Sequence, residues 1–329
     1  ALLVLANGTV IYGRGAGAAG TAVGEVCFNT AMTGYQEILT DPSYAGQIIT
    51  FTFPHIGNVG ANTEDIETSN LAAASGVKGC VLRTSITSPS NWRAAQDFNS
   101  WLEARGIIGI TGVDTRALTA LIRENGMQNA VIAHAPDGVF DVDALKEEAA
   151  AWSGMVGLDL AKDVTCGQSY TWDETSWRWG EGYGRQESPR FHVVAIDFGL
   201  KRNILRELAT VGCQITVVPA TTSAEAILAR NPDGVFVSNG PGDPKECKEA
   251  IQLAKDLKGK LPLFGICLGH QVLSLSLGAD TYKLKFGHRG SNHPVIDLRT
   301  EKVMMTSQNH GYAVKVDTLP ENMELTHMN

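Results

Sequence analysis

The feature that most constrains this chain is a cysteine framed by two glycines, Gly265-Ile266-Cys267-Leu268-Gly269. The apolar run that precedes it predicts a buried strand, and the apolar-rich stretch that ends at Gly278 predicts a helix. A strained strand-to-helix turn that holds a reactive side chain clear of the backbone is a nucleophile elbow. Both glycines are needed, because a Cβ at either position would collide with the neighbouring turn. The sequence therefore predicts a cysteine nucleophile.

The position of Cys267 also bears on its protonation. Free N–H groups and the helix dipole at a helix N-terminus stabilise negative charge, so this placement favours the thiolate. A cysteine between a strand and a helix is often only an inert core residue. Here the Gly-x-Cys-x-Gly frame, with a strand before it and a helix after it, favours the reactive interpretation.

The second half of the chain alternates strands and helices. Strands are expected at 192–197, 214–218, 234–238 and 261–265, and helices at 202–209, 223–229, 246–257 and 268–277. Apolar strands that alternate with amphipathic helices imply a parallel sheet covered on both faces. Ligands of such sheets bind at the carboxyl ends of the strands. The elbow lies at such an end, and so does the loop Asn239-Gly240-Pro241-Gly242-Asp243-Pro244.

That loop supplies what a cysteine nucleophile lacks. Attack on an amide carbonyl creates an oxyanion, which needs positioned N–H donors. The natural donors are the backbone N–H of Leu268 and an N–H from the Gly240–Gly242 loop. A glycine-proline turn without function would look similar, but its place beside the elbow favours the functional interpretation.

The first half has a β-rich opening, from 1 to about 56, in which Asn7-Gly8 predicts a hairpin. Helices are expected at 91–104, 114–124 and 141–151. The glycine-rich stretch 13–20 resembles a phosphate loop only superficially, because it lacks the P-loop lysine. The domains expected are 1–180 for scaffolding and partner docking, a linker at 181–190, and 191–329.

Composition excludes several classes of protein. The 329 residues are 43% apolar and 19% charged, as in a globular protein, and exceed the usual size of one domain. A net charge of −8 indicates neither nucleic-acid nor anionic-membrane binding. No run approaches the ~18 apolar residues of a membrane span. Six cysteines without CxxC pairs indicate no zinc site, no other metal and no disulfide framework, and they favour a cytoplasmic location.

Together, Gly265–Gln271 and Ser238–Pro244 resemble the class I glutamine amidotransferase family. The first half narrows the resemblance to the small subunit of carbamoyl phosphate synthetase. The segments of the first half that carry it are Phe28–Glu37, Asp41–Tyr44 and Pro54–Gly60. In the second half they are Ile196–Gly199, Lys201–Ile204, Lys285–His288, Asn292–Pro294 and Gln308–Gly311. The resemblance implies an α/β fold: a parallel sheet flanked by helices in the C-terminal domain and a β-rich N-terminal α/β domain.

The resemblance also implies glutamine hydrolysis through a Cys267 thioester, with ammonia passed to a large subunit for carbamoyl phosphate synthesis. No cofactor is expected in this chain; ATP, Mg²⁺ and bicarbonate are expected at the large subunit. The residues that match glutamine-contacting positions are Ser43, Gly240, Gly242, Leu268, Gln271, Asn309, Gly311 and Tyr312. Ser43 would bring the first domain to the rim of the active site.

The family's base and its orienting acid belong to a His-Pro-Glu motif, which does not occur in these 329 residues. We expect it beyond Asn329, with the amidotransferase domain truncated at its C-terminus, and assign neither His270 nor His310 as the base. Two alternatives remain open. One is a non-catalytic, amidotransferase-like partner or regulatory subunit, if the chain truly ends at Asn329. The other is an amidotransferase of another synthase, which would leave the first domain unexplained.

Overall fold

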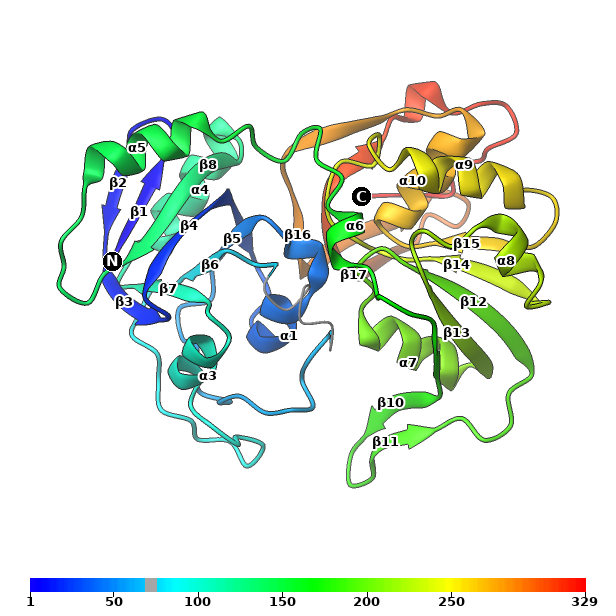
Figure 1. Ribbon diagram of the computed structural model, residues 1–329, viewed down its shortest axis with the longest axis horizontal. Helices are drawn as coiled ribbons and strands as arrows, with labels where there is room; N and C mark the ends of the chain where they lie inside the picture. Colours follow the sequence, from blue (N-terminus) through cyan, green and yellow to red (C-terminus); the bar gives the residue numbers. More distant parts are fainter. Residues whose placement is uncertain (69–75) are drawn as a thin grey trace.

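The computed structural model describes residues 1–68 and 76–329. Two sheets stand side by side, and the long strands β16 (Thr281–Asp297) and β17 (Val303–Val314) lie between them (Figure 1). These strands pair antiparallel with each other, and β18 (His327–Met328) pairs with β16. The architecture is the mixed α/β fold expected from the sequence, with a β-rich first half and a parallel sheet in the second.

The first half is built on a mixed sheet in the order β2-β1-β8-β4-β5-β6-β7-β3. Its strands are β1 (Leu2–Leu5), β2 (Val10–Tyr12), β3 (Arg14–Gly17), β4 (Gly20–Asn29), β5 (Gln47–Phe51), β6 (Gly79–Val81), β7 (Ile108–Thr111) and β8 (Gln128–His134). The hairpin predicted at Asn7-Gly8 is confirmed, because β1 and β2 pair antiparallel around it. The glycine-rich stretch forms β3 and the start of β4.

Helical segments of the first half begin at aspartate caps, except α1 (Tyr35–Thr40), which begins after Gly34 without a side-chain cap. The others are the 3-10 turn η1 (Pro42–Tyr44), α3 (Phe98–Ala104), α4 (Thr115–Asn125) and α5 (Val142–Ala151). The helix expected from Asn91 begins only at Phe98, because Asp97 accepts the N–H of Ser100 and so starts the helix there. The predicted helix at 114–124 is confirmed as α4, with Gly126 at its C-terminus in a left-handed conformation.

The second sheet has the order β15-β14-β12-β13-β9. Its strands are β9 (Tyr170–Trp172), β12 (Phe191–Asp197), β13 (Cys213–Pro219), β14 (Gly234–Val237) and β15 (Leu263–Gly265). Strands β12 to β15 pair parallel, as predicted, and β9 joins antiparallel at the edge. The helices are α6 (Ala161–Val164), α7 (Arg202–Thr210), α8 (Ala224–Leu228), α9 (Lys248–Leu257), α10 (Leu268–Leu277) and the 3-10 turn η2 (Val316–Thr318).

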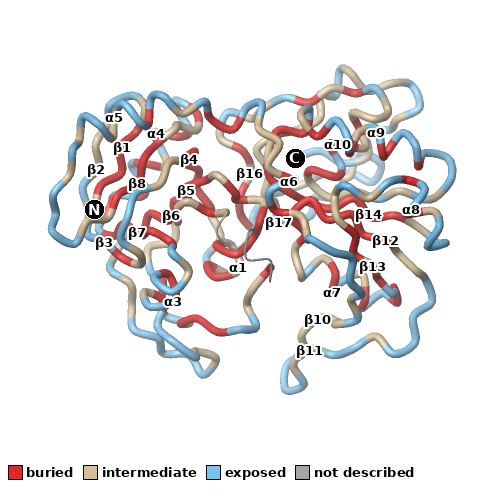
Figure 2. The backbone as a smooth tube through the Cα atoms, viewed as in Figure 1, coloured by how far each residue is buried: buried red, intermediate tan, exposed pale blue. Residues whose placement is uncertain are grey.

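Successive side chains along the parallel strands point to opposite faces of the sheet, and each face packs against its own layer of helices. On β12, Val194 and Ile196 pack in the cluster that contains Leu253 of α9 and Leu268 of α10. Between them, Ala195 points to the other face and packs with Leu205 of α7. Figure 1 shows α8, α9 and α10 on one side of the sheet and α7 on the other, and Figure 2 shows the buried backbone along its strands. The parallel sheet is therefore covered on both faces.

The segment expected as a linker is structured in part. Strand β11 (Gly182–Arg185) lies inside 181–190 and pairs antiparallel with β10 (Glu174–Arg178). Strand β9 already belongs to the second sheet, so the passage between the sheets lies upstream of the expected linker. Glycine at 180 and 182, both with positive φ, allows the tight turn, and the ring of Tyr183 stacks against Arg206 of α7.

The fold places the elbow glycines against other backbone segments. An ideal Cβ at Gly269 would lie 2.0 Å from the carbonyl oxygen of Val237, at the end of β14. A Cβ at Gly265 would lie 2.5 Å from the carbonyl carbon of Gly269. Both clashes are with backbone atoms, which cannot rotate away. The glycine requirement predicted from the sequence is therefore confirmed.

We expect Gly269→Ala to destabilise the second half by more than ~2 kcal/mol, because the first turn of α10 would have to move away from β14. The matched control is Gly167→Ala, since no atom lies within 4 Å of a Cβ there and its φ is not left-handed. The measurement is the urea unfolding midpoint of each variant. Equal midpoints for the two variants would show that the close approach does not require glycine.

Candidate active site

Cys267 occupies the apex of the turn between β15 and α10. Its backbone has φ 54° and ψ −110°, a conformation that a residue with a Cβ rarely adopts. It is one of three non-glycine residues with positive φ among those described. Such strain persists only where the surrounding structure enforces it, and it is common at reactive residues. The elbow predicted from the sequence is therefore present.

Three backbone groups surround the sulfur. The Cys267 thiol donates a hydrogen bond to the carbonyl oxygen of Asn309 at 3.3 Å. The backbone N–H groups of Leu268 and Gly240 are directed at the sulfur, and both lower the pKa of the thiol. These are the two donors expected from the sequence. Gly240 is held close by the fold, because a Cβ there would lie 2.0 Å from the carbonyl oxygen of Phe198.

The protonation state differs from the one expected. Burial, with a smaller contribution from the carboxylate of Asp41, raises the pKa of the Cys267 thiol to about 11. The two N–H groups and the guanidinium of Arg289 oppose this shift without reversing it. The helix N-terminus favours the thiolate as expected, but removal of the sulfur from water disfavours the charged form more, so the net shift of the pKa is upward.

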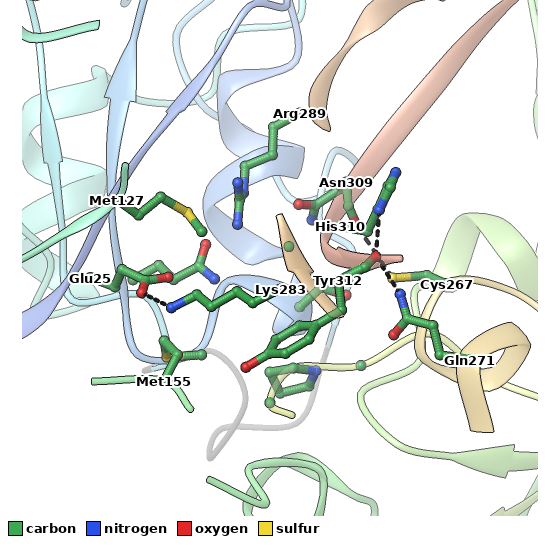
Figure 3. Close-up of a pocket in the computed structure, with 16 residues that line it drawn as sticks. Glu25, Met127, Met155, Cys267, Gln271, Lys283, Arg289, Asn309, His310 and Tyr312 are labelled. Atoms are coloured by element: carbon green, nitrogen blue, oxygen red, sulfur yellow. Dashed lines mark hydrogen bonds and ion pairs between the residues drawn. The ribbon is translucent and has the colours of Figure 1, made fainter. Parts of the chain in front are cut away.

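The sulfur faces a pocket between the two halves of the molecule (Figure 3). Seven of the predicted contact residues line it, together with Cys267: Ser43, Gly240, Gly242, Gln271, Asn309, Gly311 and Tyr312. Leu268 reaches the site through its backbone N–H. Ser43 comes from η1 of the first half, as expected. The structure thus brings all the predicted positions together.

Hydrogen bonds hold the wall of the pocket in place. The Gln271 side-chain amide donates to the carbonyl oxygen of Tyr312 at 2.7 Å, which ties α10 to β17. The Asn239 side-chain amide donates to the hydroxyl of Ser43 at 2.9 Å and to the carbonyl of Gly199. These bonds fix residues from separate segments relative to Cys267, so the pocket is formed before a ligand arrives.

Asp41 joins the two halves at this pocket. One oxygen of its buried carboxylate accepts the backbone N–H of Ser43 at 2.9 Å. The other accepts the side-chain amide of Asn309 at 3.0 Å and lies 3.6 Å from the ammonium of Lys201. The sequence patterns assigned no role to Asp41. A usable signal was available, because an aspartate directly before a proline is typical of a cap at a short helical turn.

Two further groups in the pocket were also missed. Lys283 on β16 pairs with the buried carboxylate of Glu25 on β4. Arg289, also on β16, is buried and lines the same pocket. Lys283 and Glu25 are 258 residues apart in the chain, so no local pattern relates them.

Neither of the two candidate histidines contacts the sulfur. His310 has both ring nitrogens engaged, Nδ1 with the carbonyl of Tyr312 at 2.8 Å and Nε2 with the side-chain oxygen of Gln308 at 2.9 Å. Burial lowers the pKa of His310 to about 4, which favours the neutral ring at pH 7, and a neutral ring donates to only one of these two oxygens. His270 is on α10, and burial lowers its pKa as well. These contacts give no support to either as the base.

Two other kinds of site are absent from residues 1–68 and 76–329. No cluster of three or more His, Cys, Asp or Glu side chains in these ranges is placed to hold a metal ion. Over the same ranges, no helix combines the length and the apolar character needed to span a bilayer.

A cysteine elbow at the carboxyl edge of a parallel sheet, with a glycine loop beside it, defines a class I glutamine amidotransferase. The family model for glutamine amidotransferase class I matches residues 194–329. A second family model, described as the carbamoyl-phosphate synthase small chain, CPSase domain, matches residues 3–132. The two matches cover both halves of the molecule and confirm both resemblances.

Relatives extend this match to the whole chain. The carbamoyl phosphate synthase small chain of Mesorhizobium japonicum is 64% identical over 100% of this chain and 83% of its own length. The protein of the same description from Bradyrhizobium diazoefficiens is also 64% identical, with the same coverage, and that of Rhizobium meliloti is 62% identical. The chain therefore belongs to the carbamoyl phosphate synthase small-chain family, whose members carry a glutamine-hydrolysing domain.

The raised pKa makes a testable prediction about the reactivity of Cys267. Because only the thiolate reacts with iodoacetamide, labelling of Cys267 should rise about tenfold per pH unit from pH 7 and level off only near pH 11. Peptide mapping by mass spectrometry at each pH measures this rate, and the same peptide in urea is the control. A midpoint near pH 7 in the folded chain would contradict the dominance of burial over the helix N-terminus.

Proposed function

We propose that this chain hydrolyses glutamine with Cys267 as the nucleophile and delivers the ammonia to a carbamoyl phosphate synthase large subunit. The observation that carries the proposal is the strained elbow, with two backbone N–H groups directed at the sulfur. Family membership supports the same reaction. The alternative of a non-catalytic partner is not favoured, because a protein without the reaction would have no need for this strained cysteine.

In the proposed reaction the Cys267 thiolate forms a bond to the carboxamide carbon of glutamine, and the electron pair of the C=O bond moves to oxygen. The N–H groups of Leu268 and Gly240 stabilise that oxyanion. The intermediate then collapses: the C–N bond breaks, the nitrogen takes up a proton and leaves as ammonia. Water cleaves the γ-glutamyl thioester to glutamate and restores the thiol.

This reaction requires a general base and acid, because an amide nitrogen leaves only after protonation. A thiol with a pKa of about 11 also needs a partner that removes its proton. We propose that a His-Pro-Glu segment, as the family resemblance implies, supplies both functions. The positive charge of its imidazolium would stabilise the thiolate more strongly than the N–H groups around the sulfur do.

The proposal assigns the other reactants to the partner. ATP, Mg²⁺ and bicarbonate would bind to the large subunit, with no cofactor in this chain, and the product would serve arginine and pyrimidine biosynthesis. Six free thiols, at Cys27, Cys80, Cys166, Cys213, Cys247 and Cys267, support a cytoplasmic location. The first half would support the site and dock to the partner.

Replacement of the nucleophile tests the proposal. With the large subunit present, Cys267→Ser should abolish carbamoyl phosphate formation from glutamine and leave formation from ammonium salt intact. Loss of a nucleophile can cost ~10⁶ in kcat by analogy with serine proteases. Cys166→Ser is the matched control, because Cys166 lies away from the pocket. Equal loss with both nitrogen sources would show that Cys267 does more than supply ammonia.

The oxyanion donors can be tested separately. Gly240→Ala places a Cβ 2.0 Å from the carbonyl oxygen of Phe198, so the loop and its N–H must shift. Loss of one such donor costs about 10²–10³ in kcat. The variant should therefore hydrolyse glutamine slowly while the KM for glutamine changes less than tenfold. Turnover close to that of the unmodified chain, measured as glutamate release, would remove Gly240 from the oxyanion site.

A further inference from the structure

Arg289 is a buried cation in the pocket that Cys267 faces. Arg289 is 2% exposed and belongs to β16. One terminal nitrogen, Nη1, donates to the carbonyl of Phe286 at 2.9 Å, and the buried Nε has no hydrogen-bond partner. Figure 3 shows the guanidinium directed into the pocket between Met127 and Asn309.

The charges near this pocket are paired except for that of Arg289. Lys283 is neutralised by Glu25, and Lys201 by Asp41. Within residues 1–68 and 76–329, no carboxylate oxygen comes within 4.0 Å of a nitrogen of Arg289. The pocket therefore carries one positive charge for which the described chain supplies no counter-ion.

A buried guanidinium without a counter-ion is unfavourable, because removing an ion from water costs several kcal/mol that only a partner offsets. A ligand that brings a carboxylate would provide this partner. The planar fork of arginine matches a carboxylate well. Gly311 lies beside Nη2 on the pocket wall, where even a Cβ would come within 3.3 Å, so a side chain at this position would crowd the guanidinium.

We infer that Arg289 is a specificity-determining residue that receives the α-carboxylate of the substrate. This rests on the proposed function, in which the ligand is glutamine, an amino acid with one anionic group. The carboxamide end would then lie at Cys267, and the carboxylate end at Arg289, on the opposite wall of the pocket from α10 (Figure 3). Amides that lack the carboxylate would be excluded, because they leave the guanidinium buried and unpaired.

The test measures alkylation of Cys267, which needs no turnover. Three reagents are compared: a chloromethyl ketone with the α-amino acid end of glutamine, the same ketone without its carboxylate, and iodoacetamide. The variants are Arg289→Met and Arg289→Lys, with Arg299→Met as the matched control because Arg299 is exposed and pairs with Asp297. Rates come from mass spectrometry of the Cys267 peptide.

We expect Arg289→Met to slow the carboxylate-bearing ketone about 10- to 100-fold, the size of one lost hydrogen bond to a charged group. Iodoacetamide and the ketone without carboxylate should slow by a smaller factor that is the same for both, because their rates reflect only the effect of Arg289 on the pKa of the Cys267 thiol. Arg289→Lys should restore part of the rate, and Arg299→Met should have no effect. In the unmodified chain, where folding is not in question, removing the carboxylate from the ketone should by itself cause a similar loss.

Two results would overturn the inference. Equal slowing of all three reagents by Arg289→Met would show that the guanidinium acts on the thiol rather than on the ligand. No dependence on the reagent's carboxylate in the unmodified chain would place that group elsewhere. Failure of the proposed function looks different: the carboxylate-bearing ketone would then show no saturation with the unmodified chain, and glutamine would not protect Cys267.

Discussion

The structure depends on the close approach of α10 to the end of β14. With glycine at 269, the first turn of the helix contacts the carbonyl of Val237 directly, and the chain must reverse within a few residues after β15. This forces Cys267 into positive φ and directs its sulfur away from the sheet. The same contact sets Leu268 and the Gly240 loop side by side. Steric exclusion of two Cβ atoms therefore organises the nucleophile and both donors.

A second level of organisation comes from Asp41. Its carboxylate collects Ser43, Asn309 and Lys201, which belong to three segments distant in sequence. The backbone carbonyl of Asn309 also accepts the hydrogen bond from the Cys267 thiol. A change at the Asp41 carboxylate would therefore reach the sulfur through a single residue, Asn309. The first half is thus part of the site.

The electrostatics of the site show burial and charge in competition. Burial makes the N–H groups of Leu268 and Gly240 more effective toward an oxyanion, because the local dielectric is low. It also holds the Cys267 thiol in its neutral form. Such a site stabilises the oxyanion intermediate more than the thiolate of the free site. It therefore needs a general base that removes the proton of the Cys267 thiol. Arg289 adds a fixed positive charge to the same pocket.

The sequence alone determined the parallel sheet and the elbow, because each is written in local patterns: apolar runs of strand length and the Gly-x-Cys-x-Gly frame. The contact positions followed from the family resemblance. Only the tertiary structure decided the protonation of Cys267, the pairing of Lys283 with Glu25 and the unpaired charge of Arg289. These depend on burial and on contacts between residues as far as 258 positions apart, which no local pattern records. Local sequence selects backbone geometry, whereas desolvation and charge pairing arise only when distant segments meet.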